Sequence, residues 1–164
     1  GLVSRGHPRV AMPAFGTFID RRHTALSLLR EIRDHILLAS VQGLSFGQLI
    51  GGVAELVPPT DALQRAHFVV EGERRLDLRL VLPTTLRAAS GAVIPVVFQS
   101  SDGIVALESD PVVVFDPNTI VQIKFRGNRN VAQVYLGGVA TPAATQPAGS
   151  YSATVTIILT DPRA

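Results

Sequence analysis

Few residues of this chain could carry out acid–base, nucleophilic or metal chemistry, and their spacing does not support it. The four histidines are scattered, with no paired ligands at the spacing of a zinc site: His7, His23, His35 and His67. Asp34 and His35 are adjacent on a predicted helix, so their side chains point apart and are not expected to form a catalytic pair. The chain has no cysteine, which excludes disulfides and thiolate chemistry.

The remaining candidate binding motifs are weak. Asp102, Glu108 and Asp110 could gather around calcium, but carboxylate oxygens are too common for this pattern to be specific. There is no nucleophile elbow, phosphate-binding loop or dinucleotide fingerprint. Two tyrosines and no tryptophan do not favour a sugar-stacking platform or an aromatic strip for single-stranded nucleic acid. We therefore expect no enzyme activity, no catalytic residues, no metal and no cofactor.

The length and composition predict one folded domain, or one domain with an arm. The chain has 164 residues, of which 46% are hydrophobic and 17% charged, so it can bury a core and is not disordered throughout. No apolar run approaches the ~20 residues of a membrane helix. No signal peptide is present, which indicates a cytoplasmic protein or a processed form. The net charge is +2, and residues 1–35 carry six arginines against three acidic groups, fewer than a nucleic-acid arm usually has.

The segment from Gln146 to Thr160 organises the chain. Its Pro-Ala-Gly sequence is typical of a turn, because proline presets φ and glycine accepts a positive φ. Apolar side chains then alternate on one face: Tyr151, Ala153, Val155, Ile157 and Leu159. This period of two predicts a long strand. The chain stops four residues later, so we expect the sheet to be left with an open edge and an open seam in the core.

Most of the chain before this segment also has the pattern of β-structure. From Ile36 onward, about seven to nine short alternating runs are separated by Gly, Pro, Asn and Asp turns, which predicts an antiparallel β-sandwich. Pro95 indicates an edge strand or a bulge for the run Ala92–Phe98. The spacing of apolar residues predicts one short amphipathic helix over Thr24–His35. The predicted organisation is an amino-terminal extension over residues 1–35 and a sandwich over 36–164.

The extension contains a further strand pattern, over about residues 10–19. Alternate positions carry apolar or small residues: Val10, Met12, Ala14, Gly16 and Phe18. Pro13 has the other parity and removes one ladder donor, which suits an edge or added strand. A floppy arm is the alternative interpretation.

Several segments occur in an order that resembles a known family. They are Gly43-Leu44-Ser45-Phe46-Gly47, Ala66-His67-Phe68-Val69-Val70-Glu71-Gly72, Leu80-Val81-Leu82-Pro83, Leu136-Gly137-Gly138 and Gln146-Pro147-Ala148-Gly149-Ser150-Tyr151. The series resembles bacterial secreted, fimbria-like proteins that are similar to spore coat protein U domains and, more remotely, to chaperone–usher pilus subunits. The resemblance covers roughly Ile36 to Asp161, and residues 1–35 fall outside it.

The resemblance implies an immunoglobulin-like sandwich that lacks its last strand, and a head-to-tail homopolymer in which each subunit receives an amino-terminal strand from its neighbour. We expect the donor strand to use Val10, Met12, Ala14, Gly16 and Phe18. We expect the acceptor groove to use Leu44, Phe46, Tyr151, Val155 and Ile157. The resemblance also implies secretion to the cell surface and allows an assembly chaperone or outer-membrane assembly protein as a partner, with no nucleic acid and no transmembrane segment.

Two other functions are compatible with the sequence. The first is a monomeric secreted binding or adhesion module, in which the same amino-terminal strand folds back on its own sandwich. The second is a capsid-like coat protein whose basic arm contacts nucleic acid through four arginines: Arg5, Arg9, Arg21 and Arg22. Steep salt dependence of nucleic-acid binding would identify the coat protein.

Overall fold

The computed structural model describes residues 9–13, 36–108, 110–125 and 131–162, and within these ranges the chain is all strand and loop. The predicted helix over Thr24–His35 lies outside the described residues. The strands in chain order are β1 (Arg9–Pro13), β2 (Leu37–Gln42), β3 (Glu55–Val57), β4 (Ala66–Glu71), β5 (Arg75–Val81), β6 (Thr85–Ala88), β7 (Val93–Val97), β8 (Gly103–Leu107), β9 (Val113–Phe115), β10 (Val121–Lys124), β11 (Val131–Leu136), β12 (Gly138–Ala140), β13 (Tyr151–Ser152) and β14 (Thr154–Thr160).

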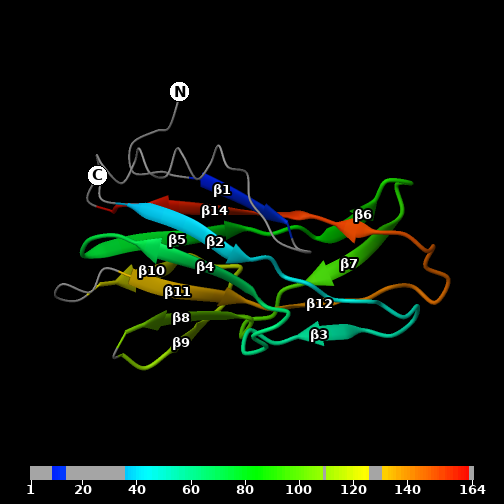
Figure 1. Cartoon of the computed structure of the whole chain (residues 1–164), viewed down its shortest axis with the longest axis horizontal. Helices are drawn as coiled ribbons and strands as arrows, with labels where there is room; N and C mark the ends of the chain where they lie inside the picture. The colour runs from blue at the N-terminus through cyan, green and yellow to red at the C-terminus, as the bar shows by residue number, and fades with distance from the viewer. Residues whose placement is uncertain (1–8, 14–35, 109, 126–130, 163–164) are drawn as a thin grey trace.

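These strands form three antiparallel sheets (Figure 1). The first sheet has the order β1-β14-β5-β10 and the second has the order β2-β4-β11-β8-β9. The third has the order β13-β6-β7-β12-β3 and lies at one end of the molecule. Along the chain, β5 is followed by β6, β11 is followed by β12, and β13 is followed by β14, so three pairs of consecutive strands connect this sheet to the other two. The predicted all-β, antiparallel sandwich is confirmed.

The sequence pattern explains which strand faces form the core. Strands β4, β5, β11 and β14 alternate strictly between buried and more exposed positions, as strands do when one face is packed and the other solvated. In β5, Leu76, Leu78 and Leu80 are buried, while Arg75 and Arg79 are exposed. The buried residues of all three sheets join in one hydrophobic core.

The junction between β11 and β12 depends on a close approach of two backbones. A Cβ added to Gly137 would lie 2.2 Å from the carbonyl oxygen of Val57, which no real side chain tolerates. Gly137 also donates its N–H to the Asp102 carbonyl at 2.8 Å. Glycine is therefore required for the second sheet to continue into the third at this point.

The prediction of an edge position or a bulge at Pro95 was wrong. Strand β7 lies between β6 and β12, and Pro95 pairs with Thr85 without a register shift. The Pro95 carbonyl accepts from Thr141, which follows the end of β12, while the Val96 N–H donates toward β6. Pro95 is therefore in register with Thr141, one residue beyond the last pair of β7 and β12, and its missing N–H leaves out the bond that would be returned to Thr141.

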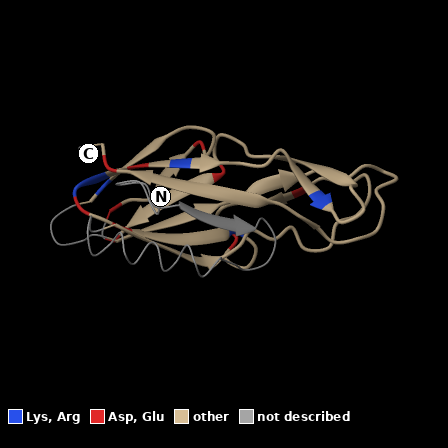
Figure 2. Cartoon of the chain, turned by 90° about the horizontal axis from the view of Figure 1, so that it is seen from above, with Lys and Arg blue, Asp and Glu red and all other residues tan. Residues whose placement is uncertain are grey.

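Charged residues are spread thinly over this fold. Figure 2 shows Lys and Arg on several separate strands and loops of the described chain, interspersed with Asp and Glu. Among the described residues, no helix has the length and apolar character needed to cross a membrane.

Candidate functional site

The best candidate site is the sheet edge covered by β1. Among the described strands, β1 pairs with β14 alone and forms one border of the first sheet, next to β2 at the border of the second. The pairing is antiparallel and runs from Arg9 opposite Ile158 to Pro13 opposite Thr154. β1 thus completes the edge of the sheet beside the last strand of the described chain.

The register relates the predicted donor and acceptor residues to one another. Val10 stands opposite Ile157 and Met12 stands opposite Val155, and these two partners are buried positions of β14. The parity predicted for the donor strand therefore coincides with the inner face of β14. The other predicted donor residues, Ala14, Gly16 and Phe18, lie outside the described part of the chain.

The predicted acceptor residues are all buried, but they lie in different parts of the fold. Val155 and Ile157 are on β14, the strand that pairs with β1, whereas Tyr151 is on β13, before the break at Ala153. Leu44 and Phe46 belong to an irregular segment after β2 and to the common core. The structure thus joins Val155 and Ile157 to the covered edge, and the role of the other three as groove residues stays a prediction.

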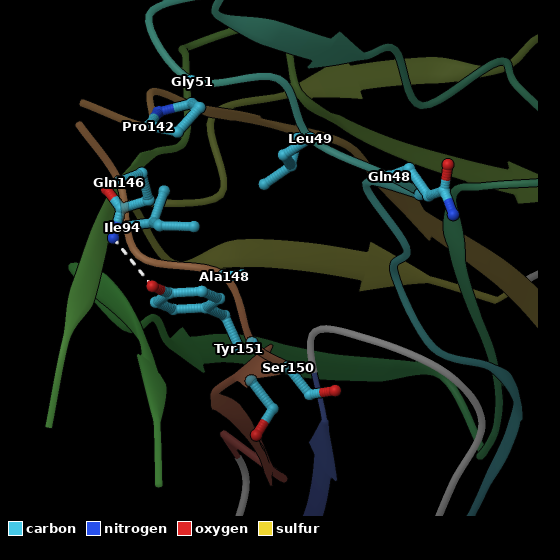
Figure 3. Close-up of a pocket in the computed structure, with 12 residues that line it drawn as sticks. Gln48, Leu49, Gly51, Ile94, Pro142, Gln146, Ala148, Ser150 and Tyr151 are labelled. Atoms are coloured by element: carbon cyan, nitrogen blue, oxygen red, sulfur yellow. Dashed lines mark hydrogen bonds between the residues drawn. The ribbon is translucent and has the colours of Figure 1, made fainter. Parts of the chain in front are cut away.

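A pocket of about 680 Å³ opens where β13 begins (Figure 3). Ile94 and Leu49 contribute apolar side chains, and Tyr151 turns its ring toward the cavity. Much of the remaining wall is small, including Ala148, Gly149 and Ser150 from the loop that leads into β13. None of the described residues that line the pocket is charged, so this part of its wall suits an apolar or neutral occupant.

Hydrogen bonds from Gln146 hold the pocket wall in place. Its side-chain amide donates to the Val93 carbonyl and to the Tyr151 hydroxyl, each at 3.0 Å. Its Oε1 accepts the Ala143 N–H at 3.0 Å. The Tyr151 hydroxyl in turn donates to the Pro147 carbonyl at 2.5 Å. The Gln-Pro-Ala-Gly-Ser-Tyr segment is therefore a loop that is stabilised by hydrogen bonds of the Gln146 and Tyr151 side chains at its two ends.

Sequence reasoning singled out this segment but missed its pocket. Leu49, Ile94 and Pro142 come from three distant parts of the chain and meet only in the folded sandwich. The sequence signal was that Gln146 and Tyr151 lie on either side of the Pro-Ala-Gly turn, and that the side chains of both residues can donate and accept hydrogen bonds.

A second polar group lies where β4 pairs with β11. The Arg65 guanidinium lies over the Tyr135 ring, 3.6 Å from its centre. His67 Nε2 is 2.6 Å from Gln133 Oε1, which is hydrogen-bond distance. Each of these side chains has a partner within the group, so we interpret the group as a cluster that stabilises the pairing of β4 and β11.

The carboxylates considered as a weak calcium pattern, Asp102, Glu108 and Asp110, do not form a metal site among the described residues. Within the described residues, no three His, Cys, Asp or Glu side chains come close enough to hold a metal ion. Asp102 is only 2% exposed and accepts the Gln99 N–H at 2.7 Å. Burial raises the pKa of Asp102 above its ordinary 3.8, and the hydrogen bond from Gln99 partly opposes this shift. The carboxylate of Asp102 therefore stabilises the turn between β7 and β8 by accepting this hydrogen bond.

Comparison with known proteins gives no match: no family model fits the chain, and neither a curated protein nor a solved structure matches it.

Proposed function

We propose that this chain is a structural subunit of an extracellular filament or surface coat, in which the amino-terminal strand of one subunit completes the sheet of the next. The observation that carries the proposal is the pairing of β1 with the edge of β14. Without β1, β14 would offer unpaired backbone groups above an apolar core, which is an aggregation hazard unless a strand covers it. The same edge can be covered by a strand from the same chain or from a neighbour.

The energetics favour a durable joint. Each ladder hydrogen bond contributes about 0.5–1.5 kcal/mol to the stability of the joint. Burial of the apolar side chains at alternate positions of the strand contributes further free energy. Donor strand and acceptor edge are different surfaces, so contacts between subunits run head to tail and extend into filaments rather than closing into dimers. Export to the cell surface, with help from an assembly chaperone or an outer-membrane assembly protein, belongs to the same proposal.

A second candidate is a monomeric secreted binding or adhesion module. It is favoured by the fact that β1 pairs with β14 of its own chain. Within one chain, the tether gives the strand an effective concentration on the order of mM, against which a neighbour's strand must compete. The two candidates differ in which copy supplies β1.

Single-cysteine variants separate these candidates, because the natural chain has no thiol that could react. Ala11 stands opposite Thr156 across the β1–β14 pair. Ala11→Cys chains are mixed with Thr156→Cys chains and treated with a short thiol-reactive crosslinker. The filament proposal predicts a covalent dimer, accompanied by filaments of the full chain in negative-stain electron microscopy.

The control mixes Ala11→Cys chains with Ser90→Cys chains. Ser90 is an exposed turn residue before β7 and should give no covalent dimer. If the mixture of Ala11→Cys and Thr156→Cys chains also gives none, but one chain carrying both changes bridges internally, the monomeric module is correct. If neither experiment yields a crosslink, β1 does not cover β14 in solution and both candidates fail.

A further inference from the structure

The pocket beside β13 has two walls, and both are attached to the segment 142–146. The first wall is the loop 47–51, which leads into Gly52. The Gly52 N–H donates to the Pro142 and Ala143 carbonyl oxygens, each at 3.1 Å. These backbone hydrogen bonds fix the first wall relative to the segment.

The second wall, residues 148–152, is attached to the same segment through Gln146. The Gln146 N–H donates to the Ala143 carbonyl at 3.0 Å, and Gln146 Oε1 accepts the Ala143 N–H at the same distance. The side-chain amide of Gln146 also donates to the Tyr151 hydroxyl. The protein's own hydrogen bonds therefore hold both walls in place, so a ligand could enter without first ordering a loop.

The largest side chains along the pocket are apolar. Ile94 and Tyr151 are only 2% and 7% exposed, and Leu49 packs against the core. Figure 3 shows Leu49 on one side of the cavity and the Tyr151 ring on the other. A planar apolar ring that enters the cavity meets an aromatic face, on which offset or edge-to-face stacking is favourable.

The polar groups deep in the wall already have partners. The Gln146 amide donates to the Val93 carbonyl and to the Tyr151 hydroxyl, which in turn donates to the Pro147 carbonyl. A ligand rich in hydroxyl groups would therefore lose hydration and gain few hydrogen bonds there. Because none of the described lining residues is charged, an ionised ligand would also lose hydration without gaining an ion pair.

We propose that this pocket binds a small, neutral molecule whose apolar ring stacks on Tyr151. The ring lies between Leu49 and Ile94, and a polar group of the ligand stays at the rim, where Gln48 and Ser150 are exposed. The cavity of about 680 Å³ has room for a fused ring system such as indole. This binding function is separate from strand exchange, because none of the described lining residues lies on β1 or β14.

Equilibrium dialysis tests the site in free and assembled chains alike. Neutral indole is compared at pH 7 with indole-3-carboxylate, which has the same ring and a negative charge. We expect one saturable indole site per chain, with a Kd on the order of 1 mM or tighter, and binding of the carboxylate that is weaker by about tenfold or more. Absence of saturable indole binding, or equal binding of the two compounds, would overturn the inference.

Substitutions in one wall show whether indole occupies the pocket. Ala148→Leu places a larger side chain in the wall and should weaken indole binding by about tenfold or more. Ala62→Leu is the matched control: Ala62 is also an exposed loop alanine, but it is not among the described lining residues, so we expect a change of less than about twofold. Ser150→Leu obstructs the same wall and replaces Ala148→Leu if that variant does not fold. Equal effects of the wall and control substitutions would overturn the inference.

A photoreactive ring locates the site directly. A neutral benzyl alcohol that carries a diazirine is irradiated with the full chain, with and without excess indole. Mass spectrometry should find the label within residues 47–52 or 142–152 or at Ile94, and indole should suppress this labelling. Labelling mainly elsewhere, for example on the exposed Val112–Val114, would indicate non-specific apolar contact and overturn the inference.

These outcomes do not depend on the test of strand exchange. If the Ala11→Cys and Thr156→Cys chains form no covalent dimer but indole binds as described, the filament proposal fails and the ligand site stands. If the dimers form but indole does not bind, strand donation stands and the ligand site is wrong.

Discussion

The side-chain amide of Gln146 donates a 3.0 Å hydrogen bond to the hydroxyl of Tyr151, five residues further along the chain. The same amide group also donates to the Val93 carbonyl on β7. One glutamine thus ties the loop before β13 both to its own end and to a strand more than fifty residues earlier. The pocket wall depends on this double attachment.

Replacing this glutamine should loosen the pocket wall. Gln146→Ala removes both donated bonds and the one accepted from Ala143, so we expect the free energy of unfolding to fall by about 1–3 kcal/mol. Urea denaturation followed by circular dichroism would measure this change. Gln48→Ala is the matched control, because Gln48 is an exposed glutamine on the same pocket and its loss should cost under about 0.5 kcal/mol. Equal losses for the two variants would contradict the role assigned to Gln146.

The glycine at the end of β11 should be far less replaceable than its neighbour. In Gly137→Ala the new methyl group would meet the Val57 carbonyl oxygen at 2.2 Å, and a backbone atom cannot rotate away. In Gly138→Ala it would meet the edge of the Phe98 ring at 3.2 Å, where a side chain can adjust. We expect Gly137→Ala to destabilise the fold by about 3 kcal/mol or more and Gly138→Ala by about 1 kcal/mol. Thermal unfolding of the two variants would rank them, and the reverse order would refute this explanation.

Local periodicity predicted much of the fold because it records which side chains must be buried. The alternation of Leu76, Leu78 and Leu80 predicted a half-buried strand, and these three residues are buried in β5. The same logic predicted the last strand, where Val155 and Ile157 are buried. Period two is imposed by the strand backbone itself, so the sequence carries it without tertiary information.

Sheet order and the pocket could not be predicted in this way. Pro95 was expected at an edge or a bulge, yet β7 is interior, and Pro95 lies just beyond the last residue pair of β7 and β12. The hydrogen bond from Gln146 to Val93 on β7 and the presence of Leu49 and Ile94 at one pocket both bring together distant parts of the chain. Such contacts depend on how strands far apart in the chain are stacked, which residue spacing does not record.

The buried carboxyl group of Asp102 should make stability depend on pH. Burial raises the folded-state pKa above the unfolded value, so the folded chain holds this proton more tightly. The Asp102 contribution to the free energy of unfolding therefore falls as pH rises from about 3.8 through the folded-state pKa, and the full cost is present above it.

Two substitutions test this dependence. Asp102→Asn removes the charge and keeps an oxygen that can accept from Gln99, so we expect its advantage over the natural chain to grow with rising pH and then level off. Asp102→Ala leaves the Gln99 N–H without this acceptor and should be less stable than Asp102→Asn, by about 1–3 kcal/mol. Urea titrations between pH 4 and pH 8 would measure both differences. A constant difference between the natural chain and Asp102→Asn would refute the assignment.

The opposite border of the second sheet should be the main site of unwanted association. β9 is a border strand, and its Val113 and Val114 are more than half exposed, as is the preceding Val112. The inner end of β9 is anchored by Phe115, whose ring packs so closely on Gly103 that a Cβ there would lie 2.7 Å away. β9 is therefore a short, uncharged, apolar edge that is fixed in an extended conformation, which is the form that pairs with other edges.

A lysine on this edge should suppress association without weakening the fold. We expect Val113→Lys to change the free energy of unfolding by less than about 0.5 kcal/mol, because the side chain is already solvated. We also expect it to reduce concentration-dependent light scattering and the sideways bundling of any filaments. The control is Val97→Lys, since Val97 is 55% exposed but lies on β7, between two paired strands. An equal reduction by Val97→Lys would show that net charge, rather than the β9 edge, governs association.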